Sequence, residues 1–366
     1  MANISSSIKR DFYPDFLRMF ASLWVVCQHL LLDHHIPQMI DSVPFLVKKA
    51  VFEYGNLGVA IFFTMSGFFM AQSLGKASVN WQSFPSLLLH RGLRLSPAYY
   101  VAILWAIVCA AFIAHHFDRS FIWPNGKDIV VHGLYLQGLI PVAIINEVFW
   151  TLCMEMQFFC CFCLIAGLSQ WIENHFQWKQ ARNFLFLGIA ILALLWPLKL
   201  IERAVPFNNG FFPFWYACSL GIFANWTLQK TLTRRSFYGY VGCATLITVL
   251  ARQFFPGVCI LTAVSLLEMA RLQRNQGIDL KQEPVSRKRQ WIQQLGILSY
   301  SLYLVHEPLL KVLFPLEHQW LGHSIGVDIL GLLVNIPICY GVAALLHYWI
   351  ETPSVVSSRT WRHRFG

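Results

Sequence analysis

The sequence predicts an all-α polytopic membrane protein with about ten transmembrane helices and both termini in the cytoplasm. Composition is the first observation that predicts this fold class, because 56% of the residues are hydrophobic, 13% are charged and the mean hydropathy is +0.51. Soluble domains usually carry about a quarter charged residues, so lipid is the expected solvent. No stretch is polar for long enough to form a soluble domain, and residues 1–366 are interpreted as one transmembrane domain.

The second observation is a series of apolar stretches, each near the roughly 20 residues that a spanning helix needs. Their approximate limits are 14–32, 52–74, 92–114, 147–168, 183–201, 210–228, 236–253, 255–271, 295–314 and 325–349. Pro353 follows the last stretch and predicts its end. An eleventh stretch, 129–145, is short and broken by Gly and Pro, and we interpret it as re-entrant or interfacial.

The third observation is the distribution of positive charge. The net charge of +10 lies in short clusters between apolar stretches, which is typical of topology signals and not of nucleic-acid binding. With ten spans, about 20 of the 28 Lys and Arg fall on the cytoplasmic side. The segment 271–294 is interpreted as a basic cytoplasmic loop, and an eleventh span would place it outside.

Two further patterns exclude other classes. The ten cysteines lie mostly in apolar runs without zinc-like spacing, so we expect small buried side chains, with no disulfide and no metal site. No convincing internal repeat is visible, so an inverted-repeat transporter is not indicated.

Ionisable groups inside apolar stretches are costly and therefore indicate functional sites. Arg18 and His29 are eleven residues apart, which places them within about 20° of one helix face and roughly 16 Å apart along the axis. With the amino terminus inside, Arg18 lies at the cytoplasmic mouth and His29 near the outer third of the bilayer. The alternative is an Arg that reaches the interface and an interfacial His.

Arg91 and Arg94 lie three residues apart at the start of the third predicted span, on one side of a helix. Paired guanidinium groups suit phosphate, because Arg presents its donors in a fixed fork. The alternative is a positive-inside anchor. Together with Arg18 they predict a polyphosphate site at the cytoplasmic mouth.

Two polar groups lie deeper in the predicted spans. Ser66 has no nucleophile-elbow motif around it and is interpreted as a hydroxyl that lines the site. Glu155 needs a partner within the membrane, and we expect an Arg or His on another helix; a purely structural ion pair is the alternative. We assign Glu155, with His29, to the predicted catalytic residues. Trp150, Tyr303 and His306 are predicted to line the site, and His306 has a structural alternative.

In this order, the segments resemble the acyltransferase-3 family of membrane-bound acyltransferases. The match covers nearly the whole chain. It consists of Arg18 with His29, Gly58-Val59 and Phe62-Phe63 through Ser66-Gly67-Phe68, Arg91-Gly92-Leu93-Arg94 with Pro97, Trp150 to Glu155 with Phe158, and Ser299-Tyr300 to His306. Thr151 stands where the family usually has Ser after Trp, and it keeps the hydroxyl.

The resemblance implies transfer of an acyl group, commonly acetyl, from cytoplasmic acetyl-CoA or another acyl-CoA to a glycan or lipid-linked glycan outside a bacterial inner membrane, such as lipopolysaccharide O-antigen. It implies that His29 is the essential histidine and that Arg18, Arg91 and Arg94 serve the donor. Direct transfer with His29 as base and a two-step route through acyl-His29 both stay open. The acceptor hydroxyl and the acyl chain are not determined.

Two rival classes stay open at this point. A transporter or flippase for a lipid-linked sugar would also use Arg, Glu and His within the membrane. The stacking of His29 over Arg18 beside Arg91 and Arg94 favours a tethered CoA donor instead. A scaffold in a glycan-assembly complex leaves the buried charges unexplained.

Overall fold

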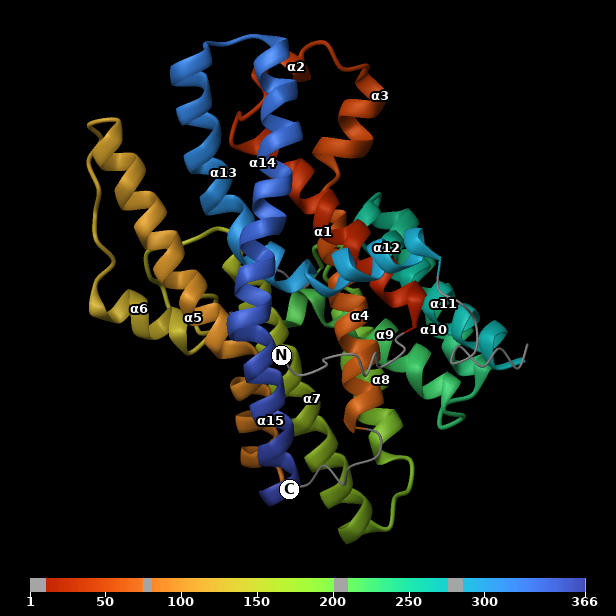
Figure 1. Ribbon diagram of the computed structural model, residues 1–366. Helices are drawn as coiled ribbons and strands as arrows, with labels where there is room; N and C mark the ends of the chain where they lie inside the picture. Colours follow the sequence, from red (N-terminus) through yellow and green to blue (C-terminus); the bar gives the residue numbers. More distant parts are fainter. Residues whose placement is uncertain (1–10, 75–80, 201–209, 276–285, 366) are drawn as a thin grey trace.

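The computed structural model describes residues 11–74, 81–200, 210–275 and 286–365, and within them the chain forms helices and no strand (Figure 1). The helices share one hydrophobic core. In chain order they are α1 (Phe12–Leu32), α2 (Pro37–Ile40), α3 (Phe45–Val47), the π-helical η1 (Lys48–Glu53), α4 (Leu57–Leu74), α5 (Phe84–His116), α6 (Gly126–Gly133), α7 (Phe149–Phe176), α8 (Ala181–Leu194), the 3-10 helix η2 (Phe212–Phe214), α9 (Trp215–Leu228), α10 (Arg234–Ala251), α11 (Phe254–Asn275), α12 (Arg287–Ile297), α13 (Ser299–Leu321), α14 (Ile325–Leu346), the π-helical η3 (His347–Glu351) and α15 (Thr352–Phe365).

Six helical segments of the described chain are long and apolar enough to cross a membrane, or seven if the bent pair α12 and α13 is one span. The multi-pass helical class is therefore confirmed. All ten predicted stretches contain a helix, but α8 and α9 have only 14 residues each, and α10 opens on Arg234 and Arg235. The count of ten and the orientation of the termini stay predictions.

The stretch 129–145 does not form a spanning helix. Asn125 and Asp128 close a reciprocal capping box at the start of α6, which ends after eight residues at Gly133. The chain then runs without a regular helix to α7. This agrees with the prediction of an irregular, non-spanning segment.

The last predicted span continues beyond its predicted end, which corrects the expectation drawn from Pro353. After α14 the chain passes through η3 into α15, and the three form one long run (Figure 1). Pro353 is the second residue of α15 and directly follows the π-helical turn η3, so the run continues through the proline instead of ending at it.

The predicted basic loop 271–294 is shorter than expected. Its first five residues belong to α11, which ends at Asn275, and its last eight belong to α12, which begins at Arg287. Most of the remaining connection, 276–285, lies outside the described residues. α12 then meets α13 at an angle of 64°.

Helix α9 lies at the centre of the bundle, because all but one of its 14 residues are buried. Two glycines let it cross α4 in backbone contact, as small residues do in membrane helices. A Cβ at Gly67 would meet the backbone of Cys218, and a Cβ at Gly221 would meet the carbonyl of Thr64. This crossing positions the face of α4 that carries Ser66.

Gly221→Ala is therefore expected to destabilise the fold by about 1–3 kcal/mol, because backbone atoms of α4 cannot move aside. The measurement is thermal unfolding of the purified protein in detergent. Gly188→Ala on α8 is the matched control, since nothing lies within 4 Å of its added Cβ. Equal melting temperatures for the two variants would contradict the packing argument.

Candidate active site around His29

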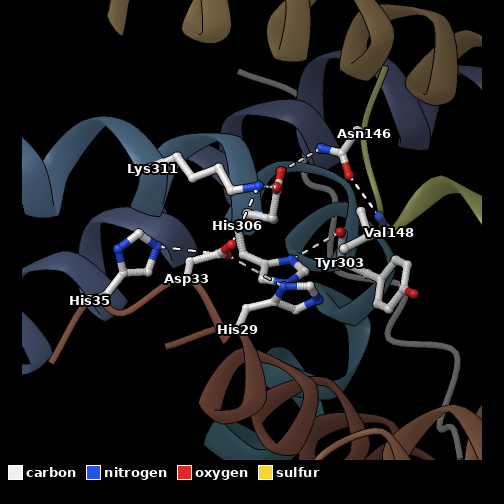
Figure 2. Close-up of polar contacts among 9 residues, drawn as sticks. His29, Asp33, His35, Asn146, Val148, Tyr303, His306 and Lys311 are labelled. Carbon is white, nitrogen blue, oxygen red and sulfur yellow. Dashed lines mark hydrogen bonds and ion pairs between the residues drawn. The ribbon is translucent and has the colours of Figure 1, made fainter. Parts of the chain in front are cut away.

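His29 lies near the end of α1 with 8% of its surface exposed. Its ring meets the ring of His306 edge to face, with centroids 5.2 Å apart (Figure 2). His306 is on α13 and is fully buried. The structure thus brings together two histidines that lie far apart in the sequence.

Hydrogen bonding fixes the tautomer of His306. Its Nδ1 lies 3.1 Å from the carbonyl oxygen of Leu302 and 2.9 Å from that of Tyr303. A carbonyl only accepts, so Nδ1 carries the proton and Nε2 keeps a lone pair. Within the described residues this buried Nε2 has no hydrogen-bond partner. His306 therefore offers an acceptor beside His29.

Asp33 lies one helical turn beyond His29, and its Oδ2 is 3.6 Å from His29 Nδ1. His35 Nε2 lies 3.8 Å from the same oxygen. Burial lowers the pKa of His35 to about 4, so this ring is neutral near pH 7. Burial raises the pKa of Asp33, but His29 and Lys311 outweigh it and hold the pKa below its usual value. Asp33 is therefore an ionised carboxylate facing His29.

Lys311 and Glu307 extend this group along α13. Lys311 Nζ lies 3.4 Å from Asp33 Oδ1 and forms an ion pair with Glu307 (Figure 2). Asn146 Nδ2 donates to Glu307 Oε2 at 2.7 Å, and its Oδ1 accepts from the backbone N–H of Val148 at 2.8 Å. Lys311 and Asn146 did not emerge from the sequence. Lys311 lies four residues after Glu307 on α13, and Asn146 lies just before an apolar helix. In the sequence both look like ordinary polar residues near the end of a membrane helix.

Tyr303 also belongs to this region. Its ring packs edge to face with Phe62 at 6.0 Å between centroids and lies 5.8 Å from the ring of His306. The hydroxyls of Tyr303 and Thr151 are hydrogen bonded 2.7 Å apart. The hydroxyl at position 151 thus ties α7 to α13 beside the two histidines.

A second polar cluster joins α4, α5 and α7. Arg91 Nη2 donates to Glu155 Oε1 at 2.5 Å, and the hydroxyl of Ser66 donates to the same oxygen at 3.3 Å. The guanidinium of Arg91 also lies over the ring of Phe159, 5.2 Å from its centroid. The expected arginine partner of Glu155 is therefore present.

Arg94 and Arg18 lie beside this cluster. Arg91, Glu155 and Arg18 are among the charged groups around Arg94. The side chain of Arg94 is exposed and forms no ion pair with any described residue. Arg18 bonds Asp15 at 2.7 Å and lies over the ring of Phe69, 4.7 Å from its centroid. The three arginines thus gather near one end of α1, away from His29.

All predicted site residues except Trp150 fall into these two groups. His29, Tyr303 and His306 form the first, and Ser66, Arg91, Arg94, Arg18 and Glu155 form the second. Glu155 contacts Arg91 and not His29, so the carboxylate beside His29 is Asp33. Trp150 packs edge to face with Phe63, centroids 5.9 Å apart, within an aromatic cluster. The roles of all these residues in a reaction stay predictions.

Fold and site together define a multi-pass helical membrane protein with a buried histidine beside a carboxylate near one end of α1 and a cluster of arginines from α1 and α5 near the other end. The family model described as Acyltransferase domain, of the acyltransferase-3 family, matches residues 11–345. The chain belongs to this family. No curated protein and no solved structure matches it. Membership supports acyl transfer, in general to a glycan acceptor.

Proposed function

We propose that the protein transfers an acetyl group from cytoplasmic acetyl-CoA across a bacterial inner membrane to a hydroxyl of an extracytoplasmic glycan, such as lipopolysaccharide O-antigen. The observation that carries this proposal is the division of polar groups along α1. His29 lies beside Asp33 near one end, and Arg18 lies with Arg91 and Arg94 near the other.

The geometry at His29 suits a general base. Asp33 faces Nδ1, which leaves Nε2 to take the proton of the acceptor hydroxyl. The oxygen then attacks the thioester carbonyl, the C–S bond breaks, and the proton on His29 passes to the departing CoA thiolate. Asp33 stabilises the imidazolium in between. An acyl-His29 intermediate is the alternative route, in which the imidazole attacks the thioester first.

The arginine cluster suits the phosphates of CoA. Arg94 is exposed and has no acidic partner among the described residues, so its donors are available to a ligand. Arg91 is held by Glu155 and keeps donors that Glu155 does not use. An extended pantetheine arm would bridge the roughly 16 Å that eleven helical residues place between Arg18 and His29.

A flippase for a lipid-linked sugar is the rival function. It would also place charges within the bundle, but His29 on one helix with Arg18, beside Arg91 and Arg94, favours a tethered CoA donor and has no special purpose in moving a sugar. Labelled acetyl-CoA distinguishes the two. Stable label on glycan supports the enzyme, and glycan movement without label supports the flippase.

In sealed vesicles of known orientation, acetyl-CoA is expected to react only from the face that carries 271–294, and acetylated glycan is expected only on the other face. The reason is that donor and base lie toward opposite ends of α1. Labelling of single cysteines placed near Glu147 and Lys281 with an impermeant thiol reagent, in a cysteine-free background, identifies each face.

Two results would count against this function. Donor and acceptor that react from the same side of vesicles shown not to leak would exclude transfer across the membrane. Absence of label on any glycan, with folded protein and a suitable acceptor, would exclude acetyl transfer itself.

A further inference from the structure

Two carboxylates from different elements share one cation beside His29. Lys311 pairs with Glu307 on its own helix and lies 3.4 Å from Asp33, at the end of α1. The side chain of Glu307 is only 4% exposed and that of Asp33 15% exposed. Buried charges of like sign need compensation, so the position of this lysine decides how each carboxylate is neutralised.

The contacts of the two carboxylates differ in strength. Glu307 has a partner on each oxygen, with Lys311 on Oε1 and Asn146 at 2.7 Å on Oε2. The contacts of Asp33 with Lys311 and His29, at 3.4 and 3.6 Å, are longer than a charge-assisted hydrogen bond. Lys311 therefore pairs primarily with Glu307, and Asp33 remains available to interact with His29.

We propose that Glu307 is a positioning residue: by holding Lys311 it keeps Asp33 available to His29, and it sets the pH range in which His29 works as a base. This inference rests on the proposed role of His29. Glu307 acts through Lys311 and Asp33 and does not itself touch the substrate.

The groups around His29 make the sign of this effect calculable. Those that face it are Asp33 and His35 after α1, and His306, Glu307 and Lys311 on α13. His35 is neutral near pH 7 because burial lowers its pKa to about 4. Helix α4, also packed along α1, has no ionisable side chain from Leu57 to Leu74. The π-helical η1, which also packs against α1, carries Lys48, Lys49 and Glu53, and α12, near the start of α1, carries Arg287, Lys288 and Arg289. The variants below leave these groups unchanged and alter only the charges of Glu307 and Lys311.

Removing each partner of the pair shifts the acid limb of the pH profile in opposite directions. In Glu307→Gln a negative charge is lost and the ammonium pairs with Asp33 instead, so the limb moves to lower pH. In Lys311→Met a positive charge is lost and the limb moves up. We expect about half a pH unit each way for charges at this distance. Glu307→Gln with Lys311→Met returns the limb close to that of the unchanged protein.

The test measures acetyl transfer against pH for these variants reconstituted in vesicles, after folding has been checked by thermal unfolding. A second readout is independent of activity: the rate at which diethyl pyrocarbonate modifies His29 at each pH, followed by peptide mass spectrometry. Glu317→Gln is the matched control. It removes a carboxylate of α13 that accepts a hydrogen bond from Asn335 at 3.0 Å. Neither the acid limb of the pH profile nor the rate of His29 modification should shift.

Shifts of opposite sign that cancel in the double variant support the inference, whereas a merely structural ion pair would lower activity without moving the limb. The inference is overturned if the acid limbs of all variants coincide, or if both single variants shift the acid limb in the same direction. If Glu307→Gln does not fold, the limb of Lys311→Met must still lie above that of Glu317→Gln. If no variant transfers acetyl but modification of His29 shifts as described, the inference stands and the proposed function fails.

Discussion

Replacing His29 by alanine is expected to reduce acyl transfer by about 10²–10⁴-fold, the usual contribution of a positioned general base. The protein should still fold, because His29 packs at the end of α1 and its Nδ1 forms no hydrogen bond to a described residue. The measurement is the initial rate of label transfer from acetyl-CoA in vesicles. Thermal unfolding in detergent shows whether the variant is folded.

His34→Asn is the control for this experiment. His34 is exposed on the neighbouring segment and has a left-handed backbone with φ of 54°, which Asn tolerates better than Ala. It should retain the rate of the unchanged protein. If folded His29→Ala transferred the acyl group at more than a few per cent of that rate, the assignment of His29 as the base would be wrong.

Replacing Arg94 by lysine is expected to raise the apparent KM for acetyl-CoA by about 10-fold or more, since hydrogen bonds to charged groups contribute about 1.5–3 kcal/mol. An ammonium keeps the charge but cannot reproduce the guanidinium fork. Arg91→Lys should act on kcat as well as KM, because it also changes the bond to Glu155. Donor saturation curves at fixed acceptor measure both effects.

Arg274→Lys provides the matched control on a different basic surface. Its Nη1 donates to the carbonyl of Leu228, and it lines a hollow of about 450 Å³ between α9, α10 and α11 together with Lys230 and Arg234. Unchanged saturation is expected. A larger rise in KM here than in Arg94→Lys would place the donor phosphates in this hollow.

How the chain crosses the membrane could be predicted only in part. Each of the ten predicted apolar stretches contains a helix, because burial in lipid requires apolar runs regardless of partners, but α12 and α15 lie largely or wholly outside those stretches. The helices α8 and α9 have only 14 residues each, and α9 is buried by its neighbours, so the count of ten spans stays a prediction. A hydropathy pattern cannot distinguish these two environments, since both are apolar.

The partners of the site residues were harder to predict. An arginine partner for Glu155 followed from the cost of a bare carboxylate in an apolar run, and Arg91 fills that place. Which residue that partner was did not follow, because α5 and α7 meet only in the folded bundle. The same holds for Asn146 and Glu307, which are 161 residues apart and form one hydrogen bond.

The sequence by itself determined that the protein is a helical membrane protein of the acyltransferase-3 family and that Arg18 and His29 lie on one helix, because hydropathy, motif order and helical spacing are local properties. Only the tertiary structure decided that His306 and Lys311 lie beside His29 and Asp33, and that Glu155 pairs with Arg91. Those contacts join helices that are distant in the chain. Their distances depend on how closely the helices pack, as where Gly58 lets α4 approach the backbone of α1, and no single segment specifies this packing.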